Sequence, residues 1–141
     1  MNPATDVHLG PNPNRGRAIW LHILFLSITP LACLILVPWW AMTHGITGAE
    51  IVAMLFLWLA TGMGITVGYH RLFSHRSYKG SPVVRLVTAI VGGAAWQGSV
   101  IRWSSGHRHH HNKVDTDNDP YNSKRGFWWS HMGWILFQNH I

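Results

Sequence analysis

The sequence has few charged residues and only one cysteine, and each of these features excludes certain classes of protein. Only 11% of its 141 residues are charged, whereas about a quarter are charged in ordinary soluble domains. Between Arg17 and Arg71 the only charged side chain is Glu50. Cys33 is the single cysteine, which excludes an intramolecular disulfide. The composition therefore fits neither a typical soluble domain nor a disulfide-stabilised one.

Long apolar runs replace the missing charges, and they predict an all-α, multi-pass membrane protein. A polar tail over residues 1–17 precedes apolar spans at about 18–42 and 51–69. The first span exceeds the roughly 20 residues that a helix needs to cross a bilayer. Basic residues flank this pair of spans, and the short loop between them has no Lys or Arg. The positive-inside rule therefore places both ends of the pair in the cytoplasm.

The third apolar stretch, residues 83–101, contains Arg85 and is ambiguous by hydropathy alone. If it crossed the bilayer, the histidine clusters on either side of it would lie on opposite membrane faces. We therefore expect an interfacial helix that dips into the membrane and returns. The cations lie beside apolar segments, which favours anionic lipid headgroups or an acidic partner over nucleic acid.

Histidines are abundant at the two places where the apolar runs end. The second cluster, residues 107–111, reads His-Arg-His-His-His. On a helix with about 100° per residue, His107, His110 and His111 share one face, and His109 points the other way. Taken alone, this cluster also fits a surface run of histidines that binds metal adventitiously.

The first cluster spans residues 70–75, with His70 and His75 five residues apart. On a regular α-helix their side chains would point about 140° apart. Both can face one metal ion only if the helix ends or is distorted after His70. The alternative for such a pair is a hydrogen-bonding or snorkelling role near a membrane surface.

Taken together, the two clusters predict a histidine-rich metal site in a cytosolic cap. Neutral imidazole is the commonest metal ligand in proteins, and imidazoles without thiolates suit Zn, Cu, Fe or Ni. Five histidines on one face favour two ions and redox or hydrolytic chemistry. The acidic run at residues 115–119 is not an EF-hand loop, because Pro120 and Gly126 stand where Gly and Glu are required. We expect it to form turns or to orient ligand histidines.

Several segments, taken in order, resemble the membrane fatty acyl desaturases of the stearoyl-CoA (delta-9) type. Residues 68–79 resemble the first histidine box of that family, and residues 107–111 resemble the second. Residues 119–127 and 130–134 resemble the segment that follows the second box. The similarity extends from about residue 45 to the end of the chain.

This resemblance implies a di-iron centre that uses O2 to introduce a cis double bond into a saturated acyl chain. Electrons would come from a ferredoxin or a cytochrome-b5-type donor, and the substrate would be an acyl-CoA or an acyl-lipid. Gln97 and Trp103 match positions that line the bend of the acyl tunnel. The implied iron ligands are His70, His75, His107, His110 and His111.

Two departures from the family pattern qualify these expectations. Ser105 and Gly106 stand where animal members carry Arg and Asp that help to hold the CoA head, which leaves acyl-lipid or acyl carrier protein open as the carrier. The third histidine box of the family lies well beyond residue 141. The resemblance therefore implies an amino-terminal fragment, with residues 18–141 a partial desaturase domain that is inactive by itself.

Two other functions remain open on the sequence. One is a related membrane di-iron lipid hydroxylase that uses the same histidine boxes. The other is a non-enzymatic metal-binding or metal-transport membrane protein. Transport is disfavoured because transporters place polar or ionisable groups within their spans, whereas both predicted spans lack formally charged residues.

Overall fold

The computed structural model describes residues 16–137, and its regular secondary structure is entirely helical. Within these residues the only β-type pairing is an isolated bridge between Ala18 and Phe137. The predicted all-α class is therefore confirmed. Most of the predicted tail, residues 1–15, and also His140 lie outside the described residues. The chain packs as two units, one over Leu34–Asn112 and one that joins residues 16–33 to 113–137.

Two long apolar helices follow one another at the start of the described chain. Helix α1 covers Trp20–His44, and α2 covers Gly48–Met63. Gly45 ends α1 with a φ of 77°, a left-handed conformation that glycine adopts without steric cost. Thr47 then caps α2, because its hydroxyl accepts from Glu50 N while its own N–H donates to Glu50 Oε2 at 2.7 Å. This capping box fixes where the second helix begins.

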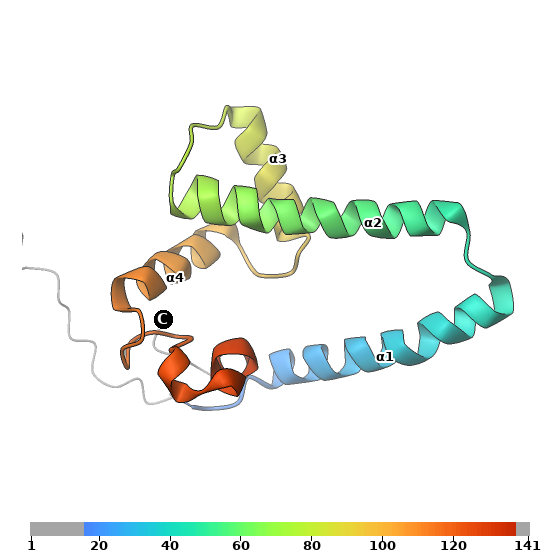
Figure 1. The fold of residues 1–141 in the computed structure, drawn as a ribbon, viewed down its shortest axis with the longest axis horizontal. Helices are drawn as coiled ribbons and strands as arrows, with labels where there is room; N and C mark the ends of the chain where they lie inside the picture. The colour runs from blue at the N-terminus through green and yellow to red at the C-terminus, as the bar shows by residue number, and fades with distance from the viewer. Residues whose placement is uncertain (1–15, 138–141) are drawn as a thin grey trace, which may run out of the picture. The chain divides into compact units, whose positions relative to one another are not determined.

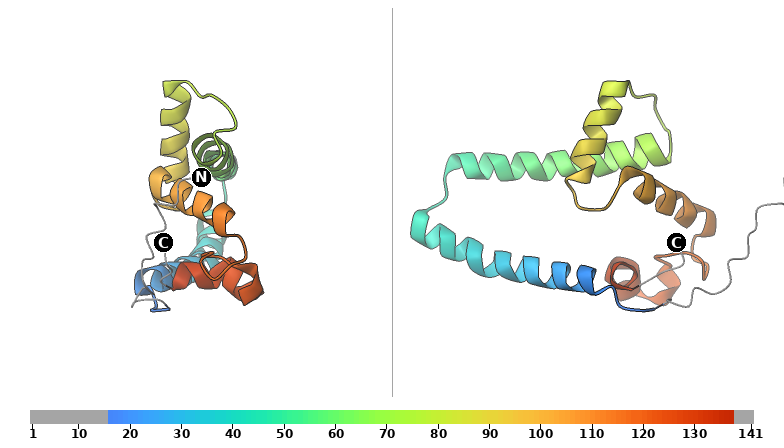
Figure 2. Two further views of the ribbon diagram at one scale, coloured as in Figure 1. Left: turned by 90° about the vertical axis from the view of Figure 1, so that its left-hand side faces the viewer. Right: turned by 180° about the vertical axis from the view of Figure 1, so that it is seen from behind.

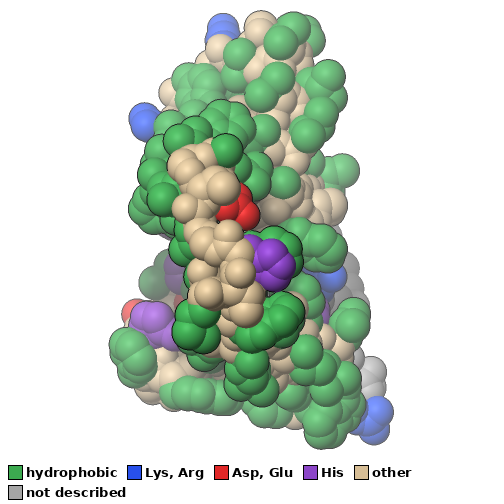
Figure 3. Space-filling view, turned by 90° about the vertical axis from the view of Figure 1, so that its right-hand side faces the viewer, with side chains coloured by type: hydrophobic (Ala, Val, Ile, Leu, Met, Phe, Trp, Pro, Cys, Tyr) green, Lys and Arg blue, Asp and Glu red, His purple; other side chains and the backbone are tan. Residues whose placement is uncertain are grey.

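Neither α1 nor α2 contains a buried residue, although both are mostly apolar. Figure 3 views the end at which the two helices are joined, and hydrophobic side chains cover most of that surface. Each candidate span, Trp20–His44 and Gly48–Ser74, is long and apolar enough to cross a bilayer. Exposed apolar surface on this scale requires another apolar phase or a partner to cover it.

The helix that starts as α2 changes its winding at Gly64. From Gly64 to Ser74 the backbone forms a π-helix, η1, and Figure 1 shows it continuing directly from α2. Helix α3, Pro82–Gly93, packs across η1, as both views in Figure 2 show. Ser81 caps α3 by accepting from Val84 N at 3.3 Å, and Pro82 occupies the first turn, where its missing N–H costs nothing.

Glycines allow η1 and α3 to pack backbone to backbone. A Cβ atom on Gly64 would lie 2.5 Å from Gly92 N, and one on Gly68 would lie 2.8 Å from the Thr88 Cβ. A Cβ on Gly92 would meet the Tyr69 ring at 2.5 Å. By contrast, a Cβ on Gly62 would meet nothing within 4 Å. The close approach of the two backbones therefore occurs at Gly64 and Gly68 but not at Gly62.

The predicted interfacial helix over residues 83–101 is two helices in the structure. Helix α3 ends at Gly93, a turn occupies residues 94–99, and α4 covers Val100–Lys113. Consecutive glycines at 92 and 93 weaken the helix, and Gly98 adopts a φ of 89°. Hydropathy does not register these breaks, because every residue of the turn except Gln97 is small or apolar. Whether this region lies at a membrane interface stays a prediction.

The second unit contains short helices and a hydrogen-bonded turn. Besides the first part of α1, its helices are η2 over Ser123–Arg125, η3 over Trp129–Gly133 and α5 over Trp134–Leu136. Asp119 is buried, and its carboxylate accepts from Asp115 N at 2.9 Å and from Tyr121 N at 3.2 Å. The acidic run at 115–119 therefore acts in turn formation, which is one of the two roles that the sequence indicates.

The glycine contacts predict opposite effects for two neighbouring substitutions. Gly64→Ala places a methyl group against the Gly92 backbone, so it should lower the free energy of unfolding by about 1–3 kcal/mol. Gly62→Ala is the matched control and should raise it by about 0.5–1 kcal/mol, because alanine favours a helix. Thermal unfolding of the full-length protein in detergent measures both effects. Equal shifts in the two variants would contradict the close packing of η1 and α3.

Candidate metal centre

The first two histidines of the site come from the π-helix and the residue that follows it. In η1 the backbone bonds connect residues five apart, and His75 N donates to His70 O at 3.0 Å. Residues i and i+5 therefore lie almost above one another, instead of about 140° apart as on an α-helix. The distortion that the spacing of His70 and His75 requires is present. It begins at Gly64, earlier than the sequence indicates.

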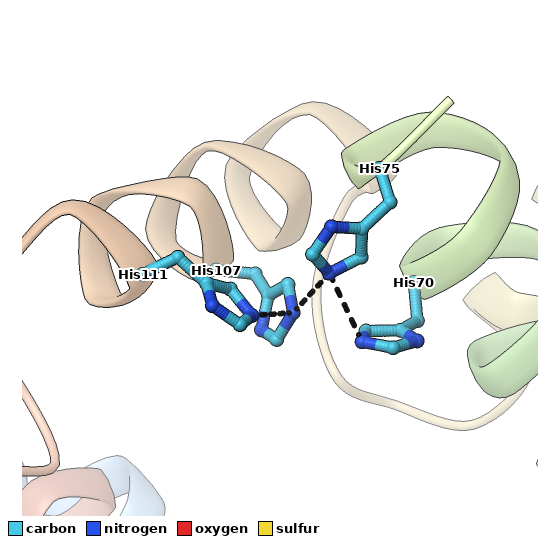
Figure 4. A group of neighbouring side chains, drawn as sticks. All are labelled: His70, His75, His107 and His111. Carbon is cyan, nitrogen blue, oxygen red and sulfur yellow. Dashed lines mark hydrogen bonds between the residues drawn. The ribbon is translucent and has the colours of Figure 1, made fainter. Parts of the chain in front are cut away.

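The second pair comes from α4, where His107 and His111 are four residues apart on one helical face. Figure 4 shows the four rings of both pairs turned toward one another. Their closest atoms are all Nε2. The Nε2 of His75 lies 3.1 Å from that of His70 and 3.1 Å from that of His107, and His107 lies 3.1 Å from His111.

Hydrogen bonds between the rings do not account for all three of these nitrogen–nitrogen contacts. A neutral imidazole Nε2 carries either one hydrogen or one lone pair, so each nitrogen takes part in one two-centre hydrogen bond. In a row of four nitrogens, at most two of the three contacts are then ordinary hydrogen bonds. A cation at the centre accepts all four lone pairs at once. The arrangement therefore favours a bound cation over a histidine hydrogen-bond chain.

The spacing of the four nitrogens also fits one metal ion. The ligand atoms of His70, His75, His107 and His111 all lie within 4.8 Å of one another. Two nitrogens bound at about 2.1 Å to one ion lie about 3.0–3.4 Å apart when adjacent, and about 4.2 Å apart when opposite. The contacts of 3.1 Å match the adjacent case, and a small inward movement brings the widest pair into range. Four imidazoles without a thiolate suit Fe, Zn, Cu or Ni.

His110, the fifth predicted ligand, is not part of this group of four. It shares the predicted face of α4, and its ring centroid lies 6.2 Å from that of His107 and 5.3 Å from that of His111. The group of four also excludes His109, as the helical phase predicts. The sequence identifies the face but does not resolve which of its histidines share one ion.

The environment of His107 keeps its imidazole neutral. Burial, together with the neighbouring rings of His111, His70, His75 and His110, lowers the pKa of His107 from 6.5 to about 4. A neutral ring offers its lone pair to a metal without first releasing a proton. At physiological pH, His107 is therefore ready to act as a ligand.

Trp103 connects the metal site to the predicted acyl-binding position. Its ring stacks on His107 with centroids 5.0 Å apart, and it meets His70 edge-on at 6.4 Å. Its indole N–H donates to Gln97 Oε1 at 2.9 Å. The two residues singled out for an acyl tunnel are thus in contact with each other. Trp103 also forms an apolar wall beside two of the four histidines.

A second group of contacts, which the motifs do not predict, holds the histidine-bearing elements together. The carbonyl oxygen of Tyr69 accepts from the Ser74 hydroxyl at 2.7 Å and from the Ser104 hydroxyl at 3.4 Å. Arg108 donates from Nη1 to the Phe73 carbonyl at 3.2 Å, and so ties α4 to η1. Ser104 lies one turn before His107 on the same face of α4. A small hydroxyl residue at that position is the feature of the sequence that could have indicated this contact.

The remaining histidines of the described chain make contacts outside the group of four. The Nδ1 of His22, in α1, lies 2.6 Å from Ile135 O. His44 stacks on Trp40 with centroids 3.9 Å apart. His131 stacks on Phe127, and its Nδ1 lies 2.8 Å from the carbonyl oxygen of that residue. These histidines are accounted for by structure.

Comparison with known proteins places the site in a family context. The family model described as fatty acid desaturase matches residues 49–141. A probable acyl-CoA desaturase from Schizosaccharomyces pombe is 40% identical over 121 residues, which cover 85% of this chain and 24% of that protein. Stearoyl-CoA desaturase 5 from Bos taurus is 36% identical over 137 residues, covering 93% of this chain and 38% of that protein.

A third relative comes from a cyanobacterium and differs in the carrier that its name gives. The sn-1 stearoyl-lipid 9-desaturase of Anabaena variabilis is 44% identical over 88 residues, covering 62% of this chain and 32% of that protein. The chain therefore spans between 24% and 38% of the length of these three relatives.

The geometry predicts which histidine substitutions weaken metal binding and which do not. In the full-length protein, His75→Ala or His111→Ala should weaken binding of Fe²⁺ by at least about 100-fold, because losing only an outer partner of a ligand already costs 10–100-fold. His109→Ala lies on the same helix turn, outside the group of four, and should leave the affinity unchanged. Chelator competition with elemental analysis measures both. Equal losses at residues 75 and 109 would show that the histidines bind metal nonspecifically.

Proposed function

The chain belongs to the fatty acid desaturase family, and on that premise we propose that the whole protein is an oxygen-dependent fatty acyl desaturase. It introduces a cis double bond, at the delta-9 position, into a saturated acyl chain. The observation that carries this proposal is the convergence of four Nε2 atoms at 3.1 Å spacings from η1 and α4. That convergence fits a metal site, and the family supplies the class of reaction.

Iron is the proposed metal, in a two-ion centre that supplies the oxidising power to remove two hydrogens with O2. His70, His75, His107 and His111 would hold one ion, because their nitrogens already lie at ligand spacing. His110, next to this group on α4, would serve the second ion with ligands from outside residues 1–141. The low pKa of His107 favours metal over protons at neutral pH.

The acyl chain is proposed to pass beside Trp103, whose ring lies against His107. The hydrogen bond from Trp103 to Gln97 fixes the indole plane. Gln97 lies in the turn between α3 and α4, where the backbone changes direction. Together they would form the bend that brings one C–C bond of the acyl chain to the metal centre. The contact between them supports this assignment.

A membrane location is proposed for α1 and for the continuous helix formed by α2 and η1. Both are long enough to span a bilayer, and neither α1 nor α2 has a buried residue. Basic residues at 15, 17, 71 and 76 flank the pair, and the connecting loop carries none. The positive-inside rule then puts the histidine site at the cytoplasmic face, where a soluble electron donor reaches it. A ferredoxin or a cytochrome-b5-type protein is the proposed donor.

The substrate carrier is proposed to be CoA or a membrane lipid. Relatives named for each carrier match this chain at similar identity. Ser105 and Gly106 replace the Arg and Asp that the family pattern uses for the CoA head, and this departure favours the lipid. Activity assays therefore need both an acyl-CoA and an acyl-lipid as substrates.

The test uses the full-length protein in membranes with O2, a reducing system and either stearoyl-CoA or a stearoyl-lipid. We expect a cis-delta-9 product that requires iron and disappears in His75→Ala. The His109→Ala variant should retain activity, because its ring is outside the site. In His110→Ala, elemental analysis should find that the protein loses one of the two proposed ions.

Product analysis distinguishes the competing functions. A hydroxylated acyl chain in place of an alkene would identify a membrane hydroxylase. A protein that holds zinc after expression with iron, and that forms neither product, would contradict both enzymatic proposals.

A further inference from the structure

A basic cavity lies beside the first histidine cluster, between the end of η1 and the start of α3. Its volume is about 520 Å³, and its lining residues are Leu72, Phe73, Arg76, Tyr78, Lys79 and Arg85. Half of these side chains carry a positive charge. The others are a buried leucine and two half-buried aromatic residues. The cavity therefore combines three cationic side chains with one aliphatic and two aromatic ones, and none of the four clustered histidines lines it.

Carboxylates do not neutralise these cations from within their own unit. No Asp or Glu occurs between Glu50 and Asp115. Glu50 is engaged at the start of α2, where its carboxylate accepts from the N–H and the hydroxyl of Thr47 at 2.7 and 2.8 Å. Three like charges on one cavity repel one another, and a bound anion relieves that repulsion. The charge balance thus points to an external anionic ligand.

The backbone holds two of the three cations in place. Arg85 lies in the first turn of the apolar helix α3, but its Nε folds back to donate to Gly80 O at 3.2 Å. Its two terminal amino groups remain to donate in parallel to two oxygens of a phosphate group. Arg76 has a φ of 50°, which is uncommon for a residue other than glycine. Ser77 stabilises this turn, because its N–H and its hydroxyl both donate to Arg71 O, at 2.9 and 3.0 Å.

We propose that this cavity binds the phosphate group of an anionic phospholipid headgroup. Arg76 and Lys79 follow closely on the apolar helix formed by α2 and η1, and Arg85 lies in the first turn of the apolar helix α3. The cations therefore occupy the level at which headgroups lie. Leu72 and Phe73 offer apolar contact for the adjoining glycerol and acyl carbons. The choice of a lipid over free phosphate rests on the membrane location in the proposed function, whereas the anion site itself does not.

The test places full-length protein in nanodiscs of phosphatidylcholine, with or without phosphatidylglycerol, and measures the Tm and the binding of spin-labelled phosphatidylglycerol. The cavity variant is Arg76→Gln/Lys79→Gln/Arg85→Gln. The matched control, Arg17→Gln/Arg102→Gln/Lys113→Gln, removes the same charge at sites that do not line the cavity. The charge-preserving variant Arg76→Lys/Arg85→Lys guards against a loss that comes from misfolding.

We expect phosphatidylglycerol to raise the Tm of the unaltered protein and of the control. The cavity variant should lose this rise and bind the labelled lipid roughly 10–100-fold more weakly, in line with three basic residues at an anionic surface. The charge-preserving variant should keep most of the effect. None of these readouts depends on desaturase activity.

Three outcomes would overturn the proposal. One is equal weakening in the cavity variant and the matched control, which would indicate general electrostatic attraction. Another is the absence of any phosphatidylglycerol effect on unaltered protein that has entered nanodiscs. The third is stabilisation by inorganic phosphate in phosphatidylcholine nanodiscs without a lipid effect, which would assign the site to a soluble anion. Failure to enter nanodiscs at all would instead contradict the proposed membrane location.

Discussion

The hydrogen bond from His75 N to His70 O, which spans five residues, is the interaction on which the candidate metal site depends. A regular α-helix would direct these two rings about 140° apart, so that only one of them could face the histidines of α4. The π-helical winding over Gly64–Ser74 instead places both rings on one side. Insertions of this kind into α-helices are rare and occur frequently at functional sites. Here the winding creates half of a ligand set from two residues that the sequence alone does not align.

The packing around Tyr69 holds that winding in place. Tyr69 is 1% exposed, and a Cβ atom on Gly92 would lie 2.5 Å from its ring, so glycine at position 92 lets α3 pack this closely on η1. Its hydroxyl donates to the carbonyls of Ala89 and Gly98, at 3.4 and 3.3 Å. Its own carbonyl accepts from Ser74 and from Ser104 of α4. The residue next to the first ligand thus connects all three elements around the site.

The sequence predicted the helical class and two long apolar helices, because these depend on composition and on the number of consecutive apolar residues. It also predicted that His70 and His75 require a distorted helix. The sequence did not reveal the break within residues 83–101, because local glycine and turn geometry end a helix without changing hydropathy. Nor did it separate His110 from His107 and His111, since helical phase assigns a face but not a distance. Three-dimensional packing settles both.

We propose that the π-helix aligns His70 with His75, so that four imidazoles bind one ion. The most direct measurement is an experimental structure of the full-length, iron-loaded protein with anomalous scattering recorded at the iron edge. We expect an iron peak about 2.1 Å from the Nε2 atoms of His70, His75, His107 and His111. We also expect π-helical hydrogen bonding through residues 64–74. Regular α-helical bonding through residues 64–74, with His75 turned away from the iron, would contradict it.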